Sequence, residues 1–208
     1  MSGKFITFEG GEGVGKSTHI RALAEFLEVR GIKVLLTREP GGTLLGESIR
    51  ALLQHDAGGE SPLPRTEVLL FCASRAQLCE QVIRPALEKG VWVLCDRFED
   101  STLAYQGAGR GWCADELRRI SRFASGGLVP DLTVLLDLPA EVGLRRVRER
   151  AEVQDRIERE DLDFHQRLRE GFLSLASGEP TRIRVVDADR EVESVKADVS
   201  RIVEELLA

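Results

Sequence analysis

A glycine-rich segment near the start of the chain has the residue types and spacing of a phosphate-binding loop. Residues 10–17 read GGEGVGKS and fit the pattern G-x-x-x-x-G-K-S/T. Glycines permit backbone angles that turn successive N–H groups toward phosphate oxygens, and a helix that follows adds its positive dipole end. In such a loop Lys16 bridges the β- and γ-phosphates, and the Ser17 hydroxyl holds Mg²⁺. The predicted nucleoside triphosphate site consists of Gly10, Gly11, Glu12, Gly13, Val14, Gly15, Lys16, Ser17 and Thr18.

A second pair of charged residues follows an apolar run later in the chain. Asp96 and Arg97 come directly after the strand-like segment 91–95. The carboxyl ends of strands in open α/β sheets face the ligand crevice, so Asp96 could organise Mg²⁺ through water. The planar guanidinium of Arg97 could neutralise a second phosphate with two hydrogen bonds. A surface ion pair that caps the strand is the alternative interpretation.

Two further segments carry groups that could bind the rest of a nucleotide. Phe71 and Arg75 are four residues apart in a helical pattern, so their side chains share one face. The ring could stack on a base and the guanidinium could read its edge, although a core phenylalanine beside a solvated arginine also fits. In the segment 38–43, Glu39, Pro40 and paired glycines predict a tight loop at the edge of the sheet.

Arginines are concentrated late in the chain, and no lysine lies among them. Six fall within fifteen residues: Arg145, Arg146, Arg148, Arg150, Arg156 and Arg159. One interpretation is an exposed helix with ion pairs between neighbouring turns. The other is a lid at about 146–160 that closes over a donor nucleotide and brings a guanidinium to its phosphoryl group. The phosphate loop itself contains no arginine, and Arg156 is the first candidate for this contact.

These segments require a parallel sheet to position them. Strand-like runs are expected at 4–9, 32–37, 91–95, 131–137 and 182–187, and helices at 16–30, 43–54, 65–89 and 191–207. Strands separated by helices pair in parallel through right-handed crossovers. The sequence therefore predicts an α/β fold with a five-stranded parallel sheet flanked by helices, in a single domain spanning residues 1–208.

Composition narrows the classes of function. The chain has 208 residues, with 29 Lys and Arg against 35 Asp and Glu, for a net charge of −6. That balance argues against a broad basic surface for nucleic acid, and no apolar run approaches the ~20 residues of a membrane span. The four cysteines show no C-x-x-C spacing, which favours free thiols in a reducing, cytoplasmic compartment.

Taken together, the motifs resemble those of the bacterial type of the thymidylate kinase family, within the P-loop nucleoside monophosphate kinases. Beyond the phosphate loop, the resemblance is carried by EPGGT at 39–43, LFCASRAQ at 70–77, DRF at 96–98, AYQG at 104–107 and DRIE at 155–158. It implies phosphorylation of dTMP to dTDP with ATP as donor, Mg²⁺ as cofactor and a homodimer. Phe98 departs from the family, which often has Tyr or His at this position.

The resemblance also implies residue roles. Phe71 would stack on thymine and Arg75 would bind its edge, while Tyr105 would disfavour a 2′-hydroxyl. The implied substrate-binding residues are Glu39, Pro40, Leu53, Phe71, Arg75, Arg97, Ser101, Thr102, Tyr105 and Gln106. The implied catalytic residues are Glu12, Lys16, Arg97 and Arg156, and the metal-binding residues are Ser17 and Asp96.

Three questions stay open from the sequence. Another nucleoside or deoxynucleoside monophosphate kinase would share the fold and donor site. A non-catalytic nucleotide-dependent switch would need the phosphate loop but not the acceptor arginines. On the helix at 65–89, the face with Leu69, Cys72, Ala76, Cys79 and Ile83 could be core or a dimer interface.

Overall fold

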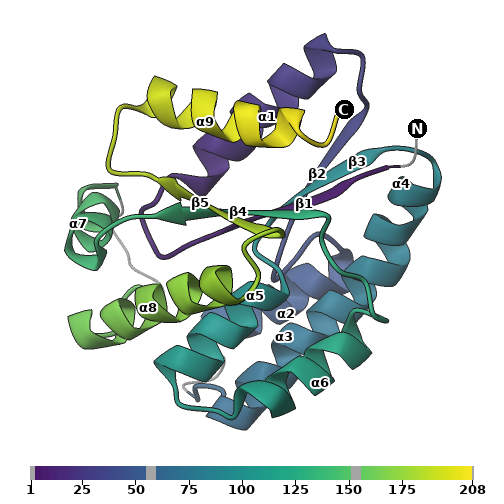
Figure 1. Ribbon diagram of the computed structural model, residues 1–208. Coiled ribbons are helices and arrows are strands. Elements are labelled where there is room, and N and C mark those ends of the chain that lie inside the picture. The colour runs from purple at the N-terminus through teal and green to yellow at the C-terminus, as the bar shows by residue number, and fades with distance from the viewer. Residues whose placement is uncertain (1–2, 55–59, 151–155, 208) are drawn as a thin grey trace.

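Five parallel strands form the centre of the fold (Figure 1). The structure, a computed structural model, describes residues 3–54, 60–150 and 156–207. The strands are β1 (Phe5–Glu9), β2 (Val34–Arg38), β3 (Trp92–Asp96), β4 (Leu132–Asp137) and β5 (Ile183–Asp187). They lie in the order β2-β3-β1-β4-β5, and every neighbouring pair is parallel. The predicted five-stranded parallel sheet is confirmed.

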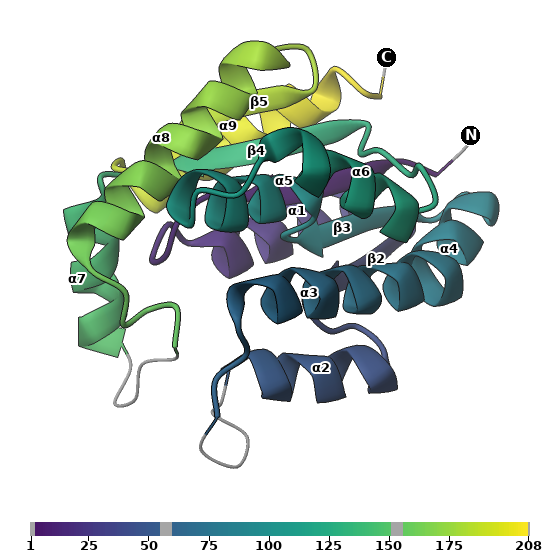
Figure 2. The same ribbon diagram turned by 90° about the horizontal axis from the view of Figure 1, so that it is seen from below.

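Helices cover both faces of the sheet (Figure 1). One face is covered by α1 (Lys16–Val29) and α9 (Val192–Glu204). The other is covered by α3 (Pro64–Leu78), α5 (Glu99–Thr102), α6 (Ala114–Ala124) and α8 (Leu162–Gly178). Figure 2 shows α3 between α6 and α2 (Leu44–Gln54), while α7 (Ala140–Arg150) lies at the carboxyl edge of the sheet. Within the described residues, no helix is long and apolar enough to cross a membrane.

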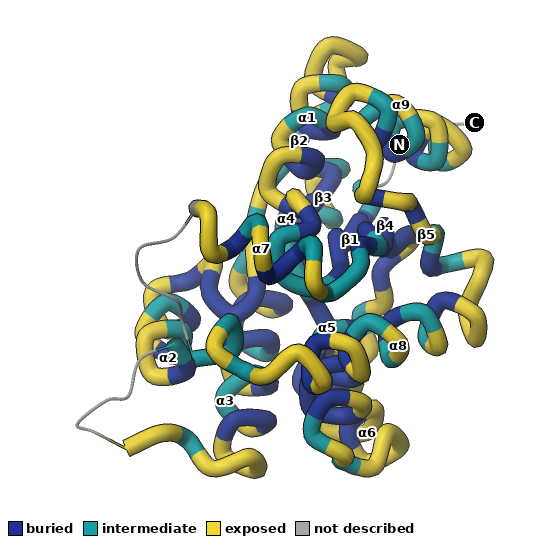
Figure 3. Tube along the Cα trace, turned by 90° about the vertical axis from the view of Figure 1, so that its left-hand side faces the viewer, coloured by how far each residue is buried: buried dark blue, intermediate teal, exposed yellow. Residues whose placement is uncertain are grey.

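Alternation along β1 divides the core between the two faces. Ile6 and Phe8 pack in the cluster under α1 and α9, whereas Phe5 packs with the residues under α3 and α4 (Arg84–Glu88). All three side chains are buried, as the period of two along a strand requires when both faces are covered. Figure 3 shows the dark, buried segments gathered along the strands and the inner sides of the helices.

A polar network holds α5 against the sheet. The hydroxyls of Thr7 and Thr133 lie 2.8 Å apart, and Thr133 donates to the Asp100 carboxylate at 3.1 Å. Arg182 binds the same carboxylate with two N–H groups, at 2.7 and 2.8 Å. Because each buried group has a partner, burial carries no uncompensated desolvation cost, and the network fixes where α5 begins.

The helix predicted over 65–89 is present but is not uniform. It consists of α3, a π-helical turn η2 (Cys79–Ile83) and α4. Pro85 has no N–H and its ring would clash with the carbonyl of residue 81 in an α-helix. The N–H of Arg84 instead bonds the carbonyl of Cys79, five residues back, so the chain forms a π turn directly before Pro85.

The apolar face of this helix is mostly core. Cys72, Cys79 and Ile83 are buried against neighbouring elements, which answers the question left open for these residues. Leu69 differs, because 54% of it is exposed. Between the helices predicted at 43–54 and 65–89, residues 55–59 lie outside the described part of the chain.

Candidate active site

The predicted phosphate loop joins β1 to α1. Lys16 is buried, and its Nζ donates to the carbonyls of Gly10 at 3.1 Å and Gly11 at 2.7 Å, so the ammonium group lies inside the loop. Gly13 has φ +70°, and a Cβ there would overlap the carbonyl of Gly143 in α7. Glycine is required at this contact because two backbones meet directly. The loop is therefore held in place by the first turns of α7.

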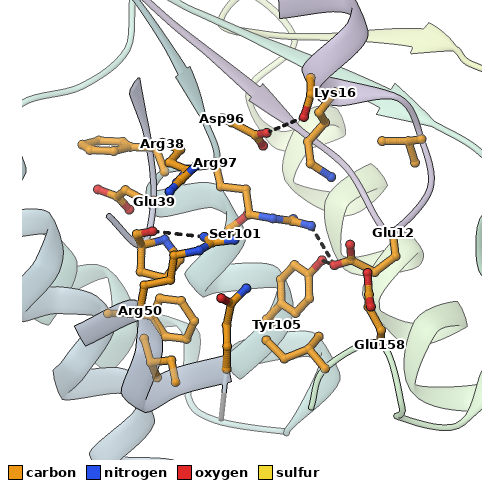
Figure 4. Close-up of a pocket in the computed structure, with 18 of the residues that line it drawn as sticks. Glu12, Lys16, Arg38, Glu39, Arg50, Asp96, Arg97, Ser101, Tyr105 and Glu158 are labelled. Carbon is orange, nitrogen blue, oxygen red and sulfur yellow. Dashed lines mark hydrogen bonds and ion pairs between the residues drawn. The ribbon is translucent and has the colours of Figure 1, made fainter. Parts of the chain in front are cut away.

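Glu12 lies between two cations at the mouth of the loop. Arg97 Nη2 donates to Glu12 Oε1 at 2.7 Å and the Tyr105 hydroxyl donates to the same oxygen at 2.6 Å (Figure 4). Burial alone would raise the pKa of Glu12, but Arg97, Lys16 and the Tyr105 hydroxyl outweigh it and lower this pKa to about 2. Burial, together with repulsion from Arg97, lowers the pKa of Lys16 to about 8.

Arg97 has a backbone conformation that is rare for its residue type. Its φ is +70°, in the left-handed region. The carboxylate of Glu9, at the end of β1, accepts from Phe98 N at 2.7 Å and from Ser101 Oγ at 2.5 Å. These bonds hold the residues that follow Arg97 in place. A strained backbone conformation such as that of Arg97 persists where the surrounding structure fixes it. Burial and the nearby Asp100 raise the pKa of Glu9 to about 8, despite these hydrogen bonds.

Arg75 is buried and bound by three segments. Its Nε and Nη2 donate to Glu39 Oε2 at 2.9 and 2.7 Å, Nη2 also donates to Thr102, and Nη1 donates to Ser121. Burial tends to lower the pKa of Arg75, but the Glu39 carboxylate outweighs it and keeps the guanidinium charged. The interpretation of a solvated arginine is therefore wrong. Among the described residues, one N–H on Nη1 has no partner.

One cavity of about 520 Å³ joins these groups. It brings together nearly all the predicted residues: Glu12, Gly13, Val14, Gly15, Lys16, Ser17, Thr18, Glu39, Pro40, Leu53, Phe71, Arg75, Asp96, Arg97, Ser101, Thr102, Tyr105 and Gln106. Gly10 and Gly11 face a smaller cavity behind the loop, although their carbonyls bind Lys16. Arg156 does not line the larger cavity. Asp96 and Arg97 do not form a surface ion pair with each other, since Arg97 pairs with Glu12.

Ser17 and Asp96 could hold a metal ion together with nucleotide oxygens. Ser17 Oγ lies 3.4 Å from Asp96 Oδ2. Adjacent ligands of octahedral Mg²⁺ lie about 2.9 Å apart, and Mg²⁺ keeps several waters and often takes substrate phosphates as ligands. The hydroxyl and carboxylate fit that chemistry. The described residues contain no group of three metal-ligating side chains, so nucleotide or water oxygens would have to complete the shell.

The arginine-rich segment divides into two described parts, since residues 151–155 of the predicted lid lie outside the described chain. On α7, Arg145 and Arg148 are exposed, whereas Arg146 lines the cavity. Arg156 donates from Nη2 to Glu67 and from Nε to the carbonyl of Leu53. Its contact with a phosphoryl group stays a prediction.

Several residues that line the cavity were not among the individual site residues predicted from the sequence. They are Arg38, Arg50, Gln54, Phe98, Arg146, Ile157 and Glu158. Helical spacing could have identified Arg50, which lies three residues before Leu53 on α2. Phe98 is fully buried, with its ring edge-on to Phe5 at 4.9 Å and Arg75 5.1 Å from its centroid. The ring of Phe98 therefore packs against the Arg75 guanidinium. A Tyr or His at this buried position would need a hydrogen-bond partner for its polar group.

Comparison with known proteins gives one consistent family. The model of the thymidylate kinase family matches residues 8–199. A thymidylate kinase of Magnetococcus marinus is 51% identical over 204 residues, covering 98% of this chain and 97% of that relative. One of Carboxydothermus hydrogenoformans is 52% identical over 206 residues, covering 99% of both chains. The crystal structure of thymidylate kinase from Ehrlichia chaffeensis matches with a TM-score of 0.80 and 33% identity, covering 98% of this chain and 100% of that one. The resemblance found in the motifs is confirmed: the chain belongs to the thymidylate kinase family.

Proposed function

We propose that this site transfers the γ-phosphoryl group of ATP to dTMP, giving ADP and dTDP, with the residues of the 520 Å³ cavity in the roles given below. Phosphorylation of dTMP follows from membership of the family, whereas the donor, the metal and the residue roles are the proposal. The observation that supports it is the continuity of the cavity from the phosphate loop, past Arg97, to Phe71 and Arg75.

Charge is the main obstacle to this reaction, because two anionic phosphates must meet. The acceptor is already an anion at neutral pH, so the site needs no strong general base. Lys16 binds the donor phosphates and Arg97 binds the acceptor phosphate, which offsets their repulsion and holds the reacting atoms in line. Mg²⁺ held by Ser17 and Asp96 would neutralise charge on the donor phosphates. Arg146 lines the cavity and could add a further positive charge from α7.

The far end of the cavity fits a pyrimidine nucleotide. Phe71 offers a ring face, and the remaining N–H of Arg75 offers one donor to the base edge. The Tyr105 hydroxyl is fixed by Glu12, and its ring lies 6.2 Å from Phe172 and 6.4 Å from Phe164. A ring held in this way can exclude a 2′-hydroxyl, which supports a preference for deoxyribose.

A coupled assay of ADP release across dTMP, dUMP, AMP and GMP tests the proposal. We expect kcat/KM for dTMP to exceed that for each of the others by at least tenfold, with no activity in Lys16→Met. Equal rates on several monophosphates would favour a broader nucleoside monophosphate kinase. Tight ATP binding without turnover on any monophosphate would favour a non-catalytic switch.

Assembly and location are further parts of the proposal. We propose one domain over residues 1–208, with a lid at about 146–160, that forms a homodimer in the cytoplasm. Exposed apolar side chains on α2, α3 and α6 support a second copy as partner: Leu44, Leu45, Leu52, Leu69, Ile120 and Phe123. The four thiols are free, including the exposed Cys113, as suits a reducing compartment. Light scattering at micromolar concentration tests the dimer, and cell fractionation tests the location.

A further inference from the structure

A buried carboxylate behind the cavity joins three separate segments. Glu67 lies in the first turn of α3 and is 1% exposed. Its Oε1 accepts from Gln106 Nε2 at 2.8 Å and from Arg110 Nε at 3.0 Å, and its Oε2 accepts from Arg156 Nη2. No sequence motif singles out this glutamate. Its three partners come from η3 (Leu103–Gly109), from the residue that follows it, and from the segment before α8.

The charges around Glu67 are balanced within the described residues. Burial would raise its pKa, but the bonds from Gln106 and Arg156 and the charge of Arg110 outweigh burial and lower this pKa. Arg110 also pairs with Glu160 at 3.0 Å, so two guanidiniums meet two carboxylates. A buried carboxylate with this many donors fixes their positions, since losing any one of them leaves it poorly compensated.

Two of these partners connect Glu67 to the cavity. Gln106 itself lines the cavity, and its amide is turned toward Glu67. Arg156 is followed by Ile157 and Glu158, which also line the cavity, and Glu158 is among the lining residues drawn in Figure 4. The Nε of Arg156 donates to the carbonyl of Leu53, another lining residue. Glu67 thus lies behind one wall of the cavity without facing it.

We propose that Glu67 is a positioning residue for the dTMP side of the site. It fixes Gln106 directly, and through Arg156 it fixes Ile157 and Glu158. Because Arg156 also binds Leu53, these contacts hold α2, α3, η3 and the segment before α8 in one cavity shape. In this arrangement Arg156 supports the wall of the cavity, and this role replaces the contact with the transferred phosphoryl group that was predicted from the sequence. The inference rests on the proposed function, because it assumes that dTMP occupies this end of the cavity.

Glu67→Gln tests the inference, because it keeps the shape and removes the charge. With dTMP varied at saturating ATP, we expect KM for dTMP to rise about tenfold while kcat and KM for ATP change less than threefold. A residue that merely stabilised the fold would lower the active fraction and Tm without moving KM. A change in KM for dTMP of less than threefold would overturn the proposal. Glu160→Gln is the matched control, since it removes only the outer partner of Arg110, and its KM for dTMP should stay within threefold.

Arg156→Ala separates the two roles for the arginine and serves if Glu67→Gln fails to fold, because Glu67 keeps Gln106 and Arg110. We expect KM for dTMP to rise as in Glu67→Gln, with the double variant no worse than either single one. A hundredfold fall in kcat with unchanged KM would show that Arg156 acts on the phosphoryl group and would overturn the proposal. Calorimetry of dTMP binding without ATP keeps the two proposals distinct. A wild-type protein that binds dTMP without turnover would count against the proposed reaction. The Kd values of the variants for dTMP would still test whether Glu67 positions the wall of the cavity.

Discussion

Replacing Arg97 with alanine removes the cation that we assign to the acceptor phosphate. In the structure the guanidinium donates to the carbonyl of Gly10 at 3.0 Å and to Glu12 at 2.7 Å, and it lies 4.9 Å from the centroid of the Tyr105 ring. It is therefore fixed between the phosphate loop and the sugar end of the cavity before substrate binds. A phosphate oxygen that met it would find the donor already oriented.

The size of the effect follows from Coulomb's law. A charge pair about 4 Å apart at an effective dielectric constant of about 20 is worth about 4 kcal/mol. If that energy is realised mainly in the transition state, its loss corresponds to roughly 10³-fold in rate, since about 1.4 kcal/mol is tenfold. Glu12 already compensates part of the Arg97 charge, which reduces the net effect. We expect kcat/KM for dTMP to fall by about 10²–10³-fold.

The assay measures kcat/KM for dTMP at saturating ATP, together with Tm. Tyr105 and Lys16 still face Glu12 in Arg97→Ala, so the variant should fold. Arg97→Lys keeps a charge but loses the planar fork, and an intermediate loss is expected. Arg38→Ala is the matched control, because Arg38 also lines the cavity but pairs with Glu47 at its exposed side. A kcat/KM for Arg97→Ala within tenfold of the wild type, with Tm unchanged, would refute the assignment.

Three further changes test the electrostatics and packing of the site. The pKa of about 8 for Lys16 means that its ammonium group loses its charge as pH rises through 8 in the free protein. ATP affinity measured by calorimetry should therefore weaken above pH 8, and Lys16→Met should lose most of this pH dependence. The pKa of Glu9 rises from 4.5 to about 8 on folding, so the folded state binds more protons between these values and its stability falls as pH rises from 4.5 to 8. Urea titrations should show Glu9→Gln gaining stability relative to the wild type as pH rises from 5 to 9, and parallel pH curves would contradict the raised pKa of Glu9. Gly143→Ala places a Cβ against the carbonyl of Glu12, so KM for ATP should rise about tenfold more than KM for dTMP; Gly178→Ala, with nothing within 4 Å, is its control.

Local patterns were sufficient to predict the sheet and the phosphate loop. Each strand can be identified from the pattern of its own five or six residues. The motif at residues 10–17 predicts the strand before it, the turn and the helix after it. The exception within the predicted elements is the π turn before Pro85, which depends on a single missing N–H. Periodicity identifies the apolar face of a helix but does not reveal one displaced hydrogen bond. The helix over 65–89 was therefore predicted, and its π turn was not.

Partners across long sequence distances could not be predicted. The sequence shows that Glu67 and Arg156 are charged, but their pairing spans 89 residues and depends on how α3 and the segment before α8 meet. The same holds for Glu9, which bonds residues 98 and 101 only because β1 and β3 are neighbours in the sheet. Arg146 was counted among the lid arginines, but nothing in its local pattern distinguished it from Arg145 or Arg148.

The charges of the site explain why its most polar residues lie so close together. Burial, together with repulsion from Arg97, lowers the pKa of Lys16, and the negative charge of Glu12 counteracts both. Without a carboxylate at this point, two buried cations would face each other before any nucleotide arrived, and one of them would lose its proton or swing into water. Glu12 therefore allows the cations to be assembled in advance. Arriving phosphates then meet oriented donors, and the free energy of orienting them has already been supplied by folding.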